Sequence, residues 1–156
     1  KVIARGDPYQ WQVERTAAAL ERGLAERGLR ADVTEIVTCY QSRVGPLEWI
    51  GPATDDEIKR AGGAGAAVVI APIAFVSEHS ETLVELDIEY AGLARDHGVA
   101  HYARVPTLGS REDFITCLAG LVTEQILDRP AQDRIVTGMA DKGLCPSTFP
   151  ACPRCG

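Results

Sequence analysis

The chain has 156 residues, 46% of them hydrophobic, and is therefore the size of one globular domain with an apolar core. Its formal net charge is −6 and Lys and Arg form no cluster, which argues against nucleic-acid binding because that binding depends on basic residues at phosphates. The longest apolar stretch, residues 64–76, contains Gly65 and Pro72 and is shorter than the roughly 20 residues of a membrane-spanning helix, so we expect a soluble protein.

The start of the sequence does not resemble a natural N-terminus. The chain begins at Lys1 rather than at an initiator Met. The charged region and the apolar region that make up a signal peptide are both missing from its first residues. We therefore expect this end to be an internal cut in a longer protein.

The spacing of apolar residues predicts the elements of the first part of the chain. From Tyr9 to Arg27 they recur every three or four residues between charged side chains, which predicts an amphipathic helix closed by Gly28. Residues 31–39 alternate between polar and apolar and predict a strand. Residues 40–54 contain Gly-Pro turn signals and predict a shaped loop, which a short helix follows over residues 54–61.

Strands alternate with helices in the rest of the predicted fold. Residues 66–73 are a continuous run rich in Val and Ile, typical of a strand covered on both faces in a parallel sheet. We expect Ser77 to cap a long helix ending near His97, a strand over residues 100–105 and a helix over residues 112–127. This order predicts a doubly wound α/β fold with a mostly parallel sheet, in a domain of residues 1–128 followed by a Cys-containing tail, residues 129–156.

An acidic window follows the predicted buried strand. Residues 77–90 hold five acids and one His but no Lys or Arg, and Glu81, Glu85 and Glu89 stack at a spacing of four on one helix face. Like charges at this spacing are destabilising by a few tenths of a kcal/mol each, a cost that a bound cation would remove. The window also begins at the carboxyl end of the strand, where open α/β sheets bind their ligands.

Structural explanations compete with a functional one at each of these residues. The acids could form a solvated helix face, and the lack of basic partners in the window makes that explanation weaker. A single His is more often structural than catalytic, and His79 gains interest only from Glu81 nearby. Trp49, in a loop rich in turn residues, could either stack on a planar ligand or pack within the loop.

The cysteines indicate metal ligation rather than a disulfide framework. Three of the five, Cys145, Cys152 and Cys155, fall in the last twelve residues, a spacing that suits either an iron–sulfur cluster or zinc. Cys39 and Cys117 lie in predicted structured elements, where we expect buried, inert thiols. A fourth ligand would then come from outside this chain.

Several motifs, taken together and in this order, resemble those of the ferrochelatases. The motifs are Arg5-Gly6-Asp7-Pro8-Tyr9, Tyr40-Gln41-Ser42-Arg43-Val44-Gly45-Pro46, Trp49-Ile50-Gly51-Pro52 and Pro72-Ile73-Ala74-Phe75-Val76-Ser77-Glu78-His79-Ser80-Glu81-Thr82-Leu83. The likeness continues through residues 85–90 and, more loosely, through residues 114–122. It implies a chelatase-like domain, the second of two similar Rossmann-like domains around a cleft.

The resemblance also implies an activity, which is the insertion of ferrous iron into protoporphyrin IX to form protoheme. In that family a π-helix after the signature turns the row Glu81, Glu85 and Glu89 toward the cleft as a path for metal ions or protons. His79 and Glu81 would act at the porphyrin and Trp49 would lie beside it. The family's further His, in a motif upstream of Arg5, is absent from this chain, so we expect the chain alone to be inactive.

Cofactor, partners and location follow from the same resemblance. The Cys tail is similar to that of ferrochelatases with a two-iron, two-sulfur (2Fe-2S) cluster, with zinc as the alternative. Partners would be protoporphyrin IX, ferrous iron as substrate and the N-terminal half of the enzyme, without nucleic acid. We expect a cytoplasmic protein, free or peripheral to the inner membrane. The alternatives are a non-catalytic metal-binding or metallochaperone domain and a redox-sensing module built on the Cys tail.

Overall fold

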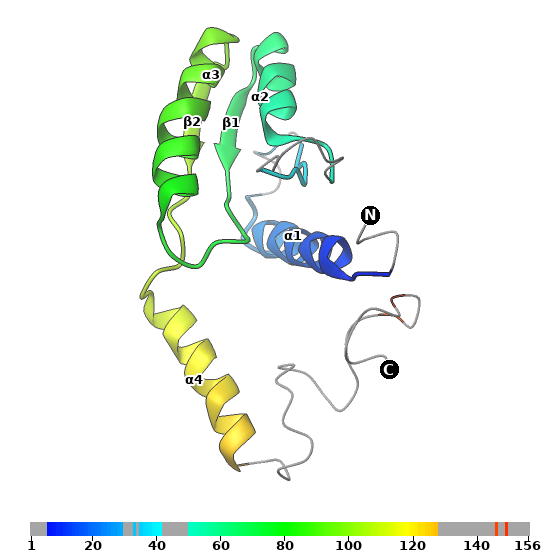
Figure 1. Cartoon of the computed structure of the whole chain (residues 1–156), viewed down its shortest axis with the longest axis vertical. Coiled ribbons are helices and arrows are strands. Elements are labelled where there is room, and N and C mark those ends of the chain that lie inside the picture. The colour runs from blue at the N-terminus through cyan, green and yellow to red at the C-terminus, as the bar shows by residue number, and fades with distance from the viewer. Residues whose placement is uncertain are drawn as a thin grey trace. The chain divides into compact units, whose positions relative to one another are not determined.

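The computed structural model describes residues 6–29, 33, 35–41, 50–127, 146 and 149. The chain divides into two compact units, each of which is described by itself: residues 10–107 form one, and the other includes residues 6–9 and 108–127. Figure 1 shows the elements in chain order, which are α1 (Tyr9–Glu26), α2 (Thr54–Gly63), β1 (Ala67–Ile70), the π-helix η3 (Glu81–Tyr90), α3 (Ala91–Asp96), β2 (His101–Arg104) and α4 (Glu112–Leu127).

The sheet of the larger unit is parallel. β1 pairs with β2, with Ala67 opposite His101 and Ile70 opposite Arg104. The chain crosses from one strand to the other through η3 and α3, which is the connection that a parallel pair requires. The predicted α/β class with a parallel sheet is confirmed, and the strands predicted over residues 66–73 and 100–105 form over shorter ranges.

A small core joins the helices to this sheet. α2 and α3 pack against each other, α2 also packs against β1, and α3 packs against β2. Ile58 of α2, Leu86 of η3 and Ala94 of α3 are only 2%, 1% and 1% exposed. Burying a side chain the size of Ile or Leu stabilises the fold by about 1.5–3 kcal/mol. Leu86 therefore anchors the π-helix through its buried face.

The strand predicted over residues 31–39 is wrong for the part that the structure describes. Residues 35–39 have no regular secondary structure, and pairing begins only at Tyr40, which forms an isolated parallel bridge with Ala53. The backbone N–H of Tyr40 donates to Pro52 O at 2.9 Å, and that of Thr54 donates to Tyr40 O at 3.2 Å. Alternation alone does not make a strand, because a ladder also needs a neighbour along its whole length.

The prediction that β1 is covered on both faces is also wrong here. Burial along the strand alternates, and Val69 is 67% exposed while Val68 and Ile70 are partly buried. α2 packs on β1, and the face to which Val69 points has no comparable cover among the described residues. The apolar composition of residues 66–73 predicted a strand buried on both faces. Burial of a face, however, requires a helix or another element that packs against it.

α1 and α4 lie close to their predicted bounds. The Asp7 carboxylate accepts a hydrogen bond from the Tyr9 N–H at the start of α1, and Gly28 follows its end with a φ of 73°. α4 exposes a row of four apolar residues: Ile115, Leu118, Val122 and Ile126.

In the ranges 6–29, 35–41 and 50–127, no helix combines the length and the apolar character needed to cross a bilayer.

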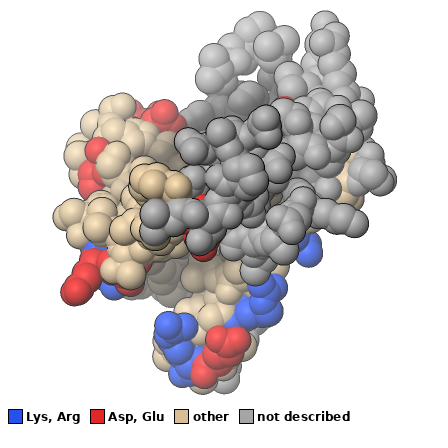
Figure 2. All heavy atoms as spheres, turned by 90° about the horizontal axis from the view of Figure 1, so that it is seen from below, with Lys and Arg blue, Asp and Glu red and all other residues tan. Residues whose placement is uncertain are grey.

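Several charged side chains on the surface form ion pairs. On the face of the molecule in Figure 2, most Lys and Arg atoms lie beside Asp and Glu atoms rather than in a separate basic patch. On α2, Lys59 contacts Asp55 at 2.7 Å, and Arg60 contacts Glu57 at 2.7 Å. Exposed pairs of this kind are typically worth about 0.2–1 kcal/mol, so they contribute little to stability.

The ends of α2 and α3 meet at a glycine. A Cβ atom built on Gly62 would lie 2.2 Å from the carbonyl oxygen of His97 and 2.8 Å from its carbonyl carbon. His97 ends α3, and Gly98 then turns the backbone with a φ of 80°. Only a residue without a side chain allows α2 and the end of α3 to come this close at Gly62 and His97.

We expect Gly62→Ala to destabilise the chain by about 1–3 kcal/mol, because a backbone group must move to admit the methyl group. Thermal unfolding followed by circular dichroism measures the change. Gly63→Ala is the matched control, since a Cβ there meets nothing within 4 Å, and it should be neutral or stabilising by up to about 1 kcal/mol. Equal midpoints for the two variants would contradict the packing argument.

Candidate functional site

The acidic window of the sequence forms a π-helix. η3 runs from Glu81 to Tyr90 and continues directly into α3. The expected π-helix is confirmed, while the expected cap at Ser77 is wrong, because the helical turn begins at Ser80 and has no side-chain cap there. π-helices are rare and frequently occur at functional sites.

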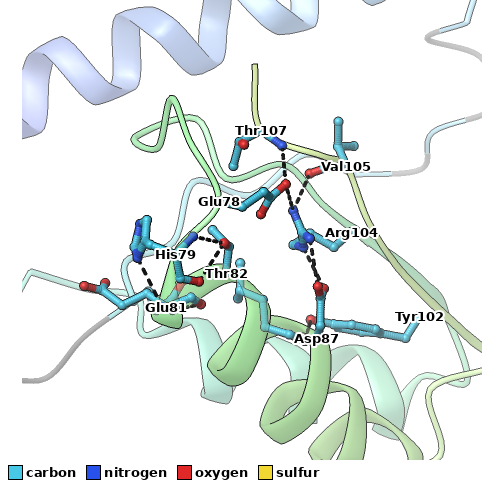
Figure 3. Close-up of polar contacts among 11 residues, drawn as sticks. Glu78, His79, Glu81, Thr82, Asp87, Tyr102, Arg104, Val105 and Thr107 are labelled. Carbon is cyan, nitrogen blue, oxygen red and sulfur yellow. Dashed lines mark hydrogen bonds and ion pairs between the residues drawn. The ribbon is translucent and has the colours of Figure 1, made fainter. Parts of the chain in front are cut away.

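The segment before η3 is fixed by a threonine instead of a cap. The buried hydroxyl of Thr82 accepts a hydrogen bond from the His79 N–H and donates one to the His79 carbonyl, both at 3.0 Å. Figure 3 shows both bonds. Since Thr82 is itself in the first turn of η3, the backbone of His79 is locked to the helix that carries Glu81.

The imidazole of His79 is held on two sides. Its ring packs edge-on against Phe75, with 4.3 Å between the centroids and 71° between the planes. Its Nδ1 accepts a hydrogen bond from the backbone N–H of Glu81 at 3.2 Å. Because a backbone N–H can only donate, the neutral ring carries its hydrogen on Nε2. In this geometry His79 presents a donor at Nε2, and Nδ1 can take a proton only by giving up the Glu81 contact.

A residue from β2 pairs with two of the five acids in the window. Arg104 donates to both carboxylate oxygens of Asp87, at 2.6 and 2.7 Å, and to Glu78 Oε1 at 2.9 Å. Its side chain is only 10% exposed. The backbone N–H of Thr107 donates to the same oxygen of Glu78 at 2.9 Å. Figure 3 shows Arg104 between the two carboxylates, so the end of β2 holds the loop before His79 and the middle of η3.

These contacts change the acidity of the groups involved. The Thr107 N–H, followed by the Thr82 side chain and then by Arg104, lowers the pKa of Glu78 from 4.5 to about 2. Arg104 also holds the pKa of Asp87 below its usual value, and its own pKa is raised, chiefly by Asp87. Both carboxylates are thus charged at neutral pH and share the single positive charge of Arg104. That pairing makes Glu78 and Asp87 structural, which the sequence window alone could not show.

The other three acids, Glu81, Glu85 and Glu89, form the row predicted from their spacing. Glu81 and Glu85 are half-buried and Glu89 is exposed. The side-chain nitrogen of Gln41 donates to the Glu81 carbonyl at 3.0 Å and to Glu85 Oε2 at 2.6 Å. Among the described residues, no three His, Cys, Asp or Glu side chains converge on a point that could hold a metal ion. Within the described residues, the row therefore presents one carboxylate after another along the helix and does not form a site where several ligands surround one metal ion.

A tyrosine from β2 supports the middle of η3. Tyr102 donates its hydroxyl hydrogen to the Leu86 carbonyl at 2.8 Å. Burial raises the pKa of Tyr102 to about 12, so the hydroxyl remains a donor through the neutral range. β2 thus contacts η3 both through this hydroxyl and through Arg104.

Some predicted site residues cannot be placed. Trp49, Cys145, Cys152 and Cys155 lie outside the described residues. Of the remaining thiols, Cys39 is partly buried and its pKa is raised by that burial. Cys117 is exposed rather than buried as expected, because within its own unit no other described helix or strand packs extensively against α4.

Sequence reasoning missed four residues of this site: Arg104, Tyr102, Gln41 and Thr82. Gln41 and Thr82 lie inside motifs that had been noted, but nothing in the motifs distinguished them from their neighbours. Arg104 is separated from Asp87 by 17 residues and from Glu78 by 26. The sequence feature that could have indicated Arg104 is its position at the end of the strand predicted over residues 100–105, because strand ends at the carboxyl edge of the sheet lie near the acidic window.

Comparisons with known proteins agree on one family. The family model described as Ferrochelatase matches residues 1–126. A protein named ferrochelatase from Caulobacter vibrioides (strain NA1000 / CB15N) is 53% identical over 149 residues, which cover 94% of this chain and 41% of that protein. Ferrochelatases from Hyphomonas neptunium and Pelagibacter ubique are 47% and 44% identical, each over 98% of this chain and 40% and 42% of their own lengths. The chain spans about two fifths of the length of the curated relatives that it matches.

The pairing of Glu78 predicts a pH dependence of stability. Its pKa is lower in the folded chain than in the unfolded one, so its contribution is present above about pH 4.5 and is lost as the pH falls toward about 2. We expect Glu78→Gln to lower the thermal midpoint at neutral pH and to match the parent chain near pH 2. Glu124→Gln, at an exposed position without a hydrogen bond or ion pair among the described residues, should leave the profile unchanged. A parental profile in Glu78→Gln would contradict the assignment.

Proposed function

The chain belongs to the ferrochelatase family, and from this premise we propose that it forms part of an enzyme that inserts ferrous iron into protoporphyrin IX. The product, protoheme, makes this the final step of heme biosynthesis. The observation that carries the proposal is the π-helix Glu81–Tyr90 with His79 and Glu81 at its start, placed directly after β1. Because the chain spans about two fifths of its relatives, we assign the activity to the whole enzyme, including its N-terminal half as a partner.

Insertion of the metal requires removal of protons. When ferrous iron enters protoporphyrin, the N–H bonds of two pyrroles break, iron–nitrogen bonds form, two protons leave and no electron is transferred. A macrocycle bent out of plane exposes the nitrogen lone pairs, so a pocket complementary to the bent form lowers the barrier. The residues at such a pocket must accept protons on one side and admit a divalent cation on the other.

The geometry supports a division of labour between His79 and Glu81. Nδ1 of His79 already accepts the Glu81 N–H, so the neutral ring offers a donor at Nε2. A carboxylate has only acceptor sites when ionised, so we assign proton acceptance to Glu81 and orientation of the macrocycle to His79. This assignment depends on a backbone hydrogen bond that links the two residues.

We assign metal supply to the row of carboxylates. Glu81, Glu85 and Glu89 run from the half-buried start of η3 to its exposed end, and oxygen ligands suit ferrous iron as a passing substrate. Asp87 is excluded from the path because Arg104 occupies both of its oxygens. Trp49 is proposed to stack beside the macrocycle, and the location in the cytoplasm, free or peripheral to the inner membrane, stays a prediction.

The cysteine tail is proposed to hold a 2Fe-2S cluster. Three thiols at Cys145, Cys152 and Cys155 are the donor chemistry of such clusters and of zinc, and a fourth ligand would come from the rest of the enzyme. The cluster would be structural or regulatory, since insertion of ferrous iron involves no change of oxidation state.

A chimaera tests the activity. This chain would replace the 149-residue segment of the Caulobacter vibrioides ferrochelatase with which it aligns, and ferrous iron insertion into protoporphyrin IX would be followed by heme absorbance. We expect activity in the chimaera, a loss of at least about 10²-fold in kcat with Glu81→Gln because a general base is removed, and parental rates with Glu124→Gln. An inactive chimaera that still binds Co²⁺ would support the metallochaperone alternative instead.

The same chimaera tests the cluster. We expect visible absorption together with bound iron and inorganic sulfide in the purified protein, all lost in Cys152→Ser because a ligand is removed. Cys117→Ser serves as the control, because this exposed thiol lies on α4 outside the tail. Stoichiometric zinc without visible absorption would support the zinc alternative, and absence of both metals would count against any metal at the tail.

A further inference from the structure

Gln41 is held in place by its neighbours in the chain. The preceding residue, Tyr40, is 8% exposed and pairs through its backbone with the segment that enters α2. The Tyr40 N–H donates to Pro52 O, and Tyr40 O accepts from the Thr54 N–H, at 2.9 and 3.2 Å. The backbone next to Gln41 is thereby anchored on both its donor and its acceptor side, so the direction of its side chain is set by the fold.

The amide of Gln41 bridges two points of η3. A primary amide nitrogen carries two hydrogens, and here one reaches the Glu81 carbonyl at 3.0 Å and the other Glu85 Oε2 at 2.6 Å. These residues are 40 and 44 positions from Gln41 in the sequence. The shorter bond has an ionised acceptor, which makes it one of the stronger kinds of hydrogen bond. Gln41 therefore ties the Glu85 carboxylate to the backbone of Glu81.

This tie leaves Glu85 with one oxygen engaged and one available. Among the described residues, Oε1 of Glu85 has no hydrogen-bond partner, so a cation can reach it while Oε2 remains bound to Gln41. Glu89, one turn further along η3, has no comparable restraint within the described part of the chain. The position of the Glu85 carboxylate is thus set by a long-range contact from another segment.

The chemistry of the donor matters as much as its position. Asp87 on the same helix is held by the guanidinium of Arg104, which neutralises its charge. Glu85 is held by a neutral amide, which restrains the carboxylate without a positive charge that would compete with an incoming cation. Two acids of the same helix therefore differ in their partners. Asp87 forms an ion pair that holds the structure together, whereas Glu85 is oriented by a neutral group and keeps its negative charge available for a cation.

We propose that Gln41 is a positioning residue for the metal path: its amide fixes Glu85 so that Oε1 receives a divalent cation from the side of Glu89 and passes it toward Glu81. The proposal rests on the proposed role of this row in supplying ferrous iron. Gln41 acts through Glu85 in this role: its amide nitrogen is a donor with both hydrogens engaged, so the nitrogen restrains the carboxylate and is not a metal ligand.

The test uses the Caulobacter chimaera with Gln41→Ala, with Gln41→Met, which is of similar size and uncharged but has no N–H donor, and with Gln10→Ala on α1 as the control. Initial rates are measured with ferrous iron and protoporphyrin IX varied separately, and Co²⁺ affinity is measured by isothermal titration without turnover. In both Gln41 variants we expect a fall of about tenfold or more in kcat/KM for iron and in Co²⁺ affinity, as for loss of a hydrogen bond to a charged group. The KM for protoporphyrin should not change, and Gln10→Ala should match the parent.

Parental kcat/KM for iron and parental Co²⁺ affinity in both Gln41 variants would overturn the proposal. So would a rise in the KM for protoporphyrin as large as that for iron, since it would indicate a general disturbance of the loop. If the unsubstituted chimaera inserts no iron, the proposed function fails, and the Co²⁺ titration still decides the role of Gln41. Far-ultraviolet circular dichroism compares folding, and Gln41→Met supplies the decisive comparison if Gln41→Ala does not fold.

Discussion

The site depends on one nearly buried charge, the guanidinium of Arg104. It occupies both oxygens of Asp87 in the middle of η3 and one oxygen of Glu78 in the segment before it. A buried cation must be paired, because leaving it unpaired in a low-dielectric setting is costly. The loop and the helix are consequently held against the end of β2, and the Thr82 hydroxyl then fixes the backbone of His79 to the first turn of the helix.

Other contacts from outside η3 complete this arrangement. Tyr102 donates to the Leu86 carbonyl, and the Gln41 amide contacts the first turn. Leu86 itself faces the core and is 1% exposed. A π-helix is intrinsically less favourable than an α-helix, so its persistence over ten residues requires tertiary contacts of this kind. The acids that these contacts leave aligned are the ones assigned to metal supply.

Two groups of acids with different roles lie on the same short helix. Glu78 and Asp87 are both paired with Arg104 and hold the loop and η3 in place, whereas Glu85 is oriented by a neutral amide. A merely solvated helix face would not show this difference between the partners of its acids. The contacts therefore argue against the interpretation of residues 77–90 as a solvated face. The exposed apolar residues, such as Val69 and Ile88, agree with a chain that spans about two fifths of its relatives' length.

The sequence by itself determined the features that depend on neighbours along the chain. Apolar spacing predicted the bounds of α1 to within one residue, and α4 matches its predicted range of residues 112–127, while α2 begins as predicted and ends two residues later, at Gly63. The ordered motifs were enough to identify the family. The π-helix was then expected from the family, because the spacing of apolar residues in 81–90 does not predict one. Tertiary structure alone decided which acids are paired, because Arg104 and Gln41 lie 17 and 44 residues from the carboxylates they hold. It also decided that residues 35–39 form no strand and that Val69 stays exposed, since ladder pairing and burial depend on partners that local sequence does not specify.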